Sequence, residues 1–235
     1  MERNPQNMAR MSADPNKSNQ IYFTVRDEII SGKYPGGTFL IENDLCKQFS
    51  VSRTPVREAL IRLAQDRFVN LIPNRGAMVP YVTIDDIVEL YQLRTANDGL
   101  AAFLIAQNHT DSLLARMEES VSREERMLKD GNISPIEISQ EDFVFHDLLS
   151  SNCANKRLID ILNQINNQMR RFTRAAADHY ALETLEKSVC FHRQAVDAIR
   201  KGDPAAAQAA MEGHWKEMMD GYIKRSVMGT LPLRI

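Results

Sequence analysis

Apolar residues repeat at helical spacing along most of the chain, and this pattern predicts a mainly α-helical protein. From residue 84 onward the periodic segments are long, and short polar breaks separate them. Six helices are expected there, over 84–108, 111–130, 137–152, 156–178, 182–201 and 204–226. Thr83 is the expected N-cap of the first, with Asp85 and Asp86 in its first turn. Long helices joined by short loops indicate an antiparallel bundle.

The N-terminal third has a different pattern. Residues 1–20 are rich in Asn, Ser, Pro and Met without periodicity, which predicts a flexible tail, with a DNA-contacting arm as the alternative. A helix is expected to begin at Ile21, where apolar residues return at helical spacing, and Gly32 with Pro35 should end it. A second, short amphipathic helix is expected over 42–49.

The segment 49–70 has the pattern of the turn and recognition helix of a helix-turn-helix. Thr54 can cap this helix, and Pro55 suits a first turn, where its missing N–H would have no partner. Three apolar residues share one face of the helix: Val56, Leu60 and Leu63. Arg53 and Arg57 lie off that face at the helix start. A cationic helix N-terminus of this kind reads base edges in the DNA major groove.

Two short strand-like runs follow, on either side of Asn74-Arg75-Gly76, and predict a β-hairpin with a cation at its tip. Together with the preceding helices, the hairpin makes a winged helix-turn-helix. The expected fold class is therefore mainly α, with an N-terminal winged helix-turn-helix and a C-terminal antiparallel all-helical bundle. The expected division is a tail (1–20), the DNA-binding domain (21–82), the bundle (83–228) and a second tail (229–235).

The runs VSRTPVREAL and NRGAMV, with the hydrophobic helix between them, resemble the DNA-binding half of the GntR family of bacterial transcription regulators. The resemblance covers roughly Ile21 to Val82 and implies a homodimer on a short palindromic operator. It places the recognition helix near the dyad and the wing in the minor groove. Asn43 stands where some members have arginine, and its amide can bond a phosphate or a base. The DNA-contacting residues expected on this basis are Asn43, Arg53, Thr54, Pro55, Arg57, Arg75 and Gly76.

Charge and cysteine content agree with this interpretation. Residues 1–80 carry 11 Lys and Arg against 8 Asp and Glu, whereas residues 81–235 carry 18 against 23, so the weak positive field lies on the DNA-binding half. Three cysteines without a C-x-x-C pair indicate reduced thiols. No run of 18 or more apolar residues and no secretion signal is present. The protein is therefore expected to be cytoplasmic, without a membrane partner.

Three histidines fall on the apolar stripes of the expected bundle helices. His146 shares a helix face with Asp142, four residues earlier, and His192 and His214 lie on two later helices. A single histidine on such a stripe is most often an ordinary core residue. Three of them with a carboxylate favour a metal site, because unpaired buried imidazoles and a buried carboxylate are costly and one cation offsets them together. The spacing alone leaves both interpretations open.

The segments DFVFHDLLSSNCANKRL and FHRQAVDAIRKGDPAAAQAAMEGHW resemble the FCD-type effector domain, which follows the GntR head in that family's largest subfamily. The resemblance implies one divalent metal per chain, held by Asp142, His146, His192 and His214, and argues against the metal-free fatty-acyl-CoA branch. This ligand set suits zinc, nickel or manganese. It also leaves one or two open positions, which a small carboxylate effector could fill. The alternative is a structural metal, which stabilises the fold of the bundle and binds no effector.

Arg94 lies within the apolar face of the first bundle helix, which the spacing places through Ile87, Leu90, Leu93, Asn97, Ala101 and Leu104. A buried arginine needs an anionic partner. Asp98, four residues on, is one candidate. The carboxylate of a small effector is the other, and FCD members use an arginine of this helix in that way.

The function expected from these features is a ligand-responsive DNA-binding transcription regulator, with repression as the expected direction. A DNA-binding protein with a purely structural metal and no effector is one alternative. A mononuclear metal hydrolase is another, since three histidines and a carboxylate can activate water. No general base stands at motif spacing beside the ligands, and an enzyme has no use for a winged head, so we do not expect an enzyme.

Overall fold

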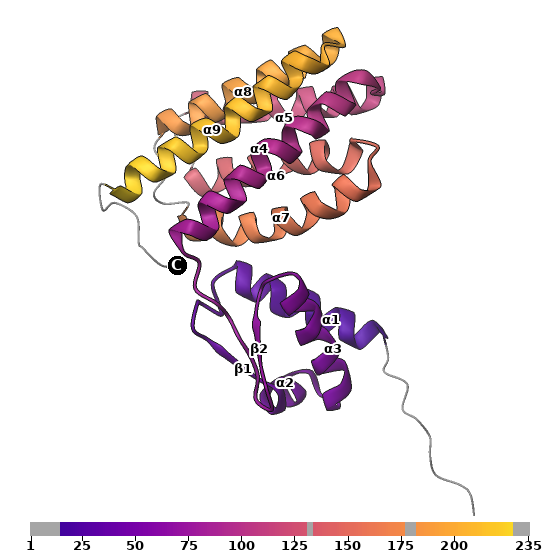
Figure 1. Cartoon of the computed structure of the whole chain (residues 1–235), viewed down its shortest axis with the longest axis vertical. Helices are drawn as coiled ribbons and strands as arrows, with labels where there is room; N and C mark the ends of the chain where they lie inside the picture. The colour runs from indigo at the N-terminus through magenta and orange to yellow at the C-terminus, as the bar shows by residue number, and fades with distance from the viewer. Residues whose placement is uncertain (1–14, 131–133, 177–181, 228–235) are drawn as a thin grey trace, which may run out of the picture. The chain divides into compact units, whose positions relative to one another are not determined.

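The computed structural model describes residues 15–130, 134–176 and 182–227 (Figure 1). The described residues divide into two compact units: the first comprises those up to Ile29 together with Gly37–Pro80, and the second comprises Ile30–Gly36 together with those from Tyr81 onward. Residues 1–14 of the first expected tail and all of the second (229–235) lie outside the described residues. The breaks expected at 131–132 and 179–180 also lie outside them. Among the described residues, no helix has the length and apolar character needed to cross a membrane.

The first unit has three helices and a small antiparallel sheet in the strand order β1-β3-β2. Its elements are α1 (Pro15–Ile30), β1 (Phe39–Ile41), α2 (Glu42–Phe49), α3 (Arg53–Gln65), β2 (Asn70–Ile72) and β3 (Gly76–Met78). The expected wing hairpin is formed by β2 and β3, in which Leu71 lies opposite Ala77. The sequence did not predict β1. Strands β2 and β3 are equally short, but the turn residues 74–76 between them indicate a hairpin, whereas β1 has no hairpin turn beside it and runs directly into α2.

Helix α1 begins at Pro15, so the expectation of a tail up to Gln20 is wrong for its last six residues. Pro15 is favourable at a helix start because its fixed φ and missing N–H cost nothing there. The turn after it is polar and therefore carried no helical signal. The buried side chains of Ile21, Val25 and Ile29 anchor the rest of α1 in the core of this unit.

Helix α3 also begins earlier than expected. Its first residue is Arg53 and its N-cap is Ser52, so Thr54 is not the cap. Pro55 then lies third in the helix, where a backbone N–H would still lack a helical partner. The expected buried face is confirmed, because Val56, Leu60 and Leu63 are at most 1 % exposed.

The second unit is a bundle of six described helices. They are α4 (Ile84–Gln107), α5 (Asp111–Asp130), α6 (Pro135–Asn152), α7 (Lys156–Ala176), α8 (Leu182–Lys201) and α9 (Pro204–Val227). The cap at Thr83 is confirmed: its hydroxyl accepts from the Asp86 N–H, and the Asp86 carboxylate accepts from the Thr83 N–H. Ser134 and Glu137 cap α6 in the same reciprocal way, which starts that helix at Pro135. Helix α9 packs along both α4 and α8 (Figure 1).

The buried face of helix α4 includes Arg94, as the sequence predicted, and Asp98, its candidate partner. Leu93, which was also expected on this face, is 49 % exposed, whereas Tyr91 is fully buried. The predicted face is therefore confirmed at Arg94 and wrong at Leu93.

The core of the bundle has two apolar parts. One includes Ala101, Leu149 and Ile199, and the other includes Ile87, Phe172 and Trp215. Buried polar side chains form bonds among all six described helices of the bundle. The members of this polar layer are Arg94 and Asp98 (α4), Glu124 (α5), Asp142, His146 and Ser150 (α6), Asn166 (α7), Ser188 and His192 (α8), and His214 and Trp215 (α9). The partly exposed Asp147 of α6 borders the layer and accepts from Asn166.

Candidate metal centre and nucleic-acid interface

Four potential metal ligands meet in the polar layer of the bundle. Asp142 and His146 come from successive turns of α6, His192 comes from α8 and His214 comes from α9. Each offers a ligand atom, and these atoms all lie within 4.8 Å of one another. The structure thus brings together the four residues that the sequence selected.

The Nε2 atoms of the three imidazoles face the same small space. His146 Nε2 lies 3.2 Å from His214 Nε2 and 3.8 Å from one carboxylate oxygen of Asp142. His192 Nε2 lies 3.7 Å from the other oxygen of that carboxylate. One ion placed among these atoms could bind three nitrogens and one oxygen, which is a donor set that zinc, nickel or manganese accepts.

The opposite ring nitrogens all contact polar side chains. His192 Nδ1 bonds a Glu124 carboxylate oxygen at 2.9 Å, and His146 Nδ1 lies 2.9 Å from an Asp98 carboxylate oxygen. The Glu124 carboxylate holds a proton on His192 Nδ1, so its Nε2 faces the other ligands. The Asp98 carboxylate lies at ion-pair distance from His146 Nδ1 but outside hydrogen-bond geometry.

His214 follows the same arrangement through Ser188. The Ser188 hydroxyl donates to Asp142 at 3.1 Å, so its oxygen is left to accept from His214 Nδ1, 3.4 Å away. In the tautomers that carry the protons on Nδ1, the lone pairs of His146 and His214 face each other across 3.2 Å, and a cation between the two nitrogens would relieve their repulsion. The four donors present therefore fit a bound metal.

Burial changes the protonation of the four groups. It lowers the pKa of His146 and of His214 well below the ordinary value, so both rings are neutral at pH 7, as metal ligands must be. Burial raises the pKa of the Asp142 carboxyl to about 6, against the opposing effect of His192. Burial alone would lower the pKa of His192, but the carboxylate of Glu124 raises it.

Arg94 is fully buried beside this centre, and its guanidinium already has protein partners. It lies 2.9 Å from a carboxylate oxygen of Asp98, donates a hydrogen bond to Asn166 and stacks over Trp215 at 4.5 Å. The pairing with Asp98 is the first of the two roles weighed from the sequence. The same Asp98 oxygen accepts from Trp215 at 2.7 Å and lies beside His146, so it joins Arg94 to a metal ligand.

A small cavity of about 20 Å³ adjoins the centre on the side of Asp142 and His214. That volume holds roughly one water molecule. Arg94 does not line it. Its lining consists of Tyr91, Ser139, Asp142, Phe143, Met169, Thr173, Leu185, His214, Trp215 and Met218.

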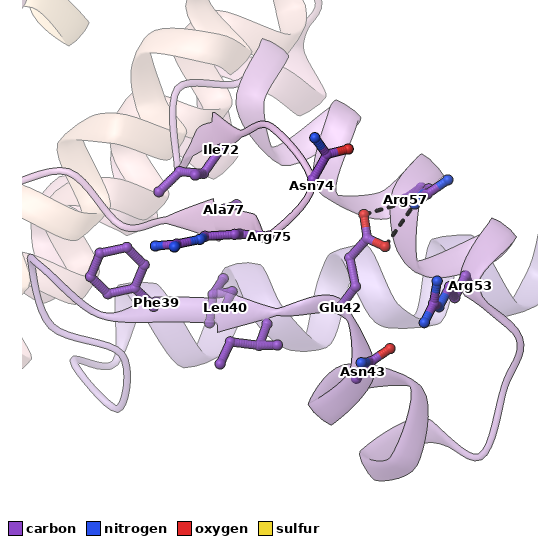
Figure 2. Close-up of a pocket in the computed structure, with 11 residues that line it drawn as sticks. Phe39, Leu40, Glu42, Asn43, Arg53, Arg57, Ile72, Asn74, Arg75 and Ala77 are labelled. Carbon is purple, nitrogen blue, oxygen red and sulfur yellow. Dashed lines mark hydrogen bonds and ion pairs between the residues drawn. The ribbon is translucent and has the colours of Figure 1, made fainter.

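The candidate nucleic-acid interface is a groove of about 730 Å³ between the start of α3 and the wing (Figure 2). Four of the seven expected DNA-contacting residues line it: Asn43, Arg53, Arg57 and Arg75. Their side chains are exposed, as is that of Thr54. Glu42 is the only acidic residue of the lining, and it accepts hydrogen bonds from Arg57 Nε at 2.9 and 3.0 Å. This ion pair raises the pKa of Arg57.

Pro55 and Gly76 are buried, so their place is structural rather than at the groove surface. Gly76 has φ 126°, and a Cβ atom there would lie 2.1 Å from the carbonyl oxygen of Leu40. Only glycine fits at this position, where β3 pairs with β1 and comes this close to its backbone. Gly76 therefore shapes the turn that presents Arg75.

Sequence reasoning missed Glu42, Glu124 and Ser188. Glu124 had a detectable signal, because it falls on the buried stripe of α5 with Leu113, Met117 and Val121. Glu42 and Ser188 had none, since the partner of Glu42 lies fifteen residues away and that of Ser188 lies on another helix.

Comparisons with known proteins match both units. The family described as bacterial regulatory proteins, gntR family, matches residues 17–79, and the FCD domain matches residues 89–217. The uncharacterized HTH-type transcriptional regulator YdhC of Bacillus subtilis is 27 % identical over 198 residues, which cover 83 % of this chain and 86 % of YdhC. The gluconate operon transcriptional repressor of Bacillus licheniformis is 28 % identical over 182 residues, 76 % of this chain and 74 % of the repressor.

Solved structures show the same fold. Escherichia coli McbR/YncC aligns with a TM-score of 0.70 at 19 % identity, covering 94 % of this chain and all of that one. A GntR-type regulator of Rhodococcus sp. RHA1, solved by structural genomics, aligns with a TM-score of 0.70 at 24 % identity and covers 92 % of this chain. At these identities the likeness supports the architecture alone.

Proposed function

Because the chain belongs to the GntR family of bacterial regulatory proteins and carries an FCD domain, we propose that it is a transcription regulator controlled by a small organic acid. Its winged head binds double-stranded DNA, and its helical bundle holds a divalent metal and the acid. The observation that carries the metal part is the convergence of three Nε2 atoms on Asp142, with each Nδ1 turned toward a polar partner.

In this proposal the groove of the first unit receives the operator. Arg57 and Arg53 approach bases from the start of α3, while Thr54 and Asn43 bond phosphates. Arg75 enters the minor groove from the wing, placed there by the turn that Gly76 allows. The protein acts as a homodimer on a palindromic site, so each contact is made twice. The three arginines that line the groove, two of them in the first turns of α3, support this assignment.

The metal would be held by Asp142, His146, His192 and His214 and would supply an electrophilic site with open coordination positions. Zinc, nickel and manganese all suit the donors, and availability in the cell decides among them. An acid could bind there through a carboxylate oxygen. Its effect on operator affinity requires different affinities for two arrangements of the protein.

The full chain tests the metal part directly. Protein purified without chelator should contain about one divalent ion per chain by elemental analysis. Trp215 is the only tryptophan of the sequence, and its ring lies 4.7 and 4.6 Å from the rings of His146 and His214. Its fluorescence should therefore change when the metal is removed and restored. A metal content far below one ion that reloading does not raise would contradict the proposal.

Arg94 is proposed to bind the carboxylate of the acid. A guanidinium has five N–H donors, and Arg94 Nε has no hydrogen-bond partner among the described residues. Arg94→Ala should leave the metal bound and lower the affinity for the acid at least tenfold, as expected for a charge-assisted pair of about 1.5–3 kcal/mol. Calorimetry on zinc-loaded protein measures this affinity.

A second variant controls for the buried charge that Arg94→Ala leaves unpaired. Arg94→Met combined with Asp98→Asn removes both charges of the pair together, which avoids that penalty. If this double variant binds the acid as tightly as the wild type does, Arg94 is only the structural partner of Asp98.

A further inference from the structure

We propose that the acid sensed by this protein has an apolar body: it is an unsubstituted aliphatic or aryl-alkyl monocarboxylate, not a polyhydroxy sugar acid. The proposal rests on the function proposed above and adds the chemical class of the ligand. It follows from the side chains around the cavity beside the metal centre. None of the expectations from the sequence bears on this class.

We expect the acid to approach the four metal-binding residues from the side on which the cavity lies. Of the four, only Asp142 and His214 line the cavity. The ring of Phe145 stacks on His192 with centroids 4.1 Å apart and covers that side of the centre. Trp215 covers His146 at 4.7 Å. A carboxylate bound at an open metal position would therefore extend its body into this cavity.

The walls of the cavity offer few partners for ligand hydroxyls. Six lining residues are aromatic or aliphatic: Tyr91, Phe143, Met169, Leu185, Trp215 and Met218. Apart from the two metal ligands, the polar atoms of the lining side chains are the hydroxyls of Tyr91, Ser139 and Thr173 and the indole N–H of Trp215. That N–H already donates to Asp98. All ten residues lie on helices, where backbone groups bond one another.

A sugar acid would therefore lose the hydration of its hydroxyls without equivalent bonds, and each unmatched hydroxyl weakens binding. An alkyl or phenyl body loses nothing of that kind and gains contact with the apolar walls.

The cavity of about 20 Å³ is smaller than such a ligand, so the walls of the cavity have to move when the ligand binds. Two of the wall residues are methionines, which are flexible. Methionine is unbranched and adapts its rotamers to a neighbouring shape. Met169 and Met218 stand on different helices on the same cavity and are nearly completely buried. Their rotation enlarges the site without a backbone shift. An apolar ligand then replaces the contacts that the two thioethers give up.

The test compares hexanoate with gluconate, two six-carbon monocarboxylates that differ in five hydroxyl groups. The zinc-loaded full chain is titrated with each acid by calorimetry, with the fluorescence of Trp215 as a second readout, because its ring lines the cavity. Hexanoate should bind at least about 100-fold more tightly than gluconate, since even one misplaced hydroxyl can change affinity by that factor. 3-Phenylpropanoate should also bind more tightly than gluconate.

Two variants assign the selectivity to the cavity. Met218→Gln keeps the chain length but adds an amide, and it should weaken hexanoate at least tenfold with the zinc content unchanged. Thr173→Val is the matched control, because it removes a lining hydroxyl at nearly constant volume. It should leave hexanoate binding unchanged or tighter.

Gluconate binding as tightly as hexanoate, or more tightly, would overturn the apolar class while leaving the proposed regulator intact. An equal response of wild type and Met218→Gln would overturn the assignment to this cavity. If zinc binds but no acid of either class does, the apolar class and the effector part of the proposed function both fail. If zinc does not bind, the metal part fails first.

Discussion

Arg57→Ala should nearly abolish specific operator binding while the fold stays intact. Arg57 lines the DNA-facing groove, and its side chain is exposed, so its removal leaves no cavity in the core. A lost bidentate contact to a base costs about 1–3 kcal/mol. A symmetric dimer loses this contact twice, about 2–6 kcal/mol in total, which predicts a decrease of about 30-fold to 25,000-fold. A gel-shift titration at fixed salt measures the change.

Two further variants make that result specific. Arg67→Ala removes the same charge from the first unit, but Arg67 does not line the groove, so operator affinity should fall only slightly. Glu42→Gln keeps the groove shape and removes the carboxylate that holds Arg57 Nε. Affinity for unrelated DNA should then rise, because one negative charge facing the phosphates is gone, while preference for the operator falls. Equal operator affinity in Arg57→Ala and wild type would remove Arg57 from the contact set.

His192→Ala should lower metal affinity at least about tenfold and abolish the response of operator binding to the acid. It deletes one of three imidazole ligands and leaves Glu124 buried without its partner. Glu124→Gln should weaken metal binding about 10–100-fold by itself, because outer partners orient metal-bound imidazoles. Operator affinity without the acid should change far less, since the winged head folds as a separate unit. Chelator competition and gel shift measure the two effects.

His109→Ala is the matched control, because His109 lies outside the set of four ligands. It should change neither metal affinity nor the response to the acid. A purely structural metal gives a different pattern in His192→Ala: thermal stability falls, and excess metal restores both stability and an unaltered acid response. That outcome would mean that the metal only stabilises the fold of the bundle and takes no part in binding the acid.

The sequence predicted most of the architecture because the helices have strong periodic signals and clear ends. Helices α2 and α5 have the predicted bounds, and Thr83 caps α4 as expected. The start of α1 was missed because its first turn is polar. Strand β1 was missed because it lacks the hairpin turn that revealed β2 and β3.

The candidate metal ligands were found for a similar reason. Each histidine is a polar residue on an otherwise apolar stripe, and Asp142 and His146 share one helix face. Their outer partners were harder to find, because a bond such as Ser188 to Asp142 joins two helices and has no counterpart in local spacing. In α4 the predicted burial of Arg94 is confirmed, but Leu93 faces solvent, because single apolar residues are common on protein surfaces and periodicity alone does not reveal them.

The connection between the two units has a mechanical consequence. Val79 exchanges backbone hydrogen bonds with Gly37 and Thr38, just before β1, and the cap at Thr83 fixes the start of α4, so residues 80–82 lie between these two points. A stretch this short spans at most about 14 Å from Val79 to Thr83, which limits how far the two points can separate. The first half of α4 supplies Ile87, Leu90 and Tyr91 to the same apolar part that surrounds the cavity. Repacking around a bound molecule that moved the start of α4 would therefore change the range of positions that this short connection leaves open to the end of β3.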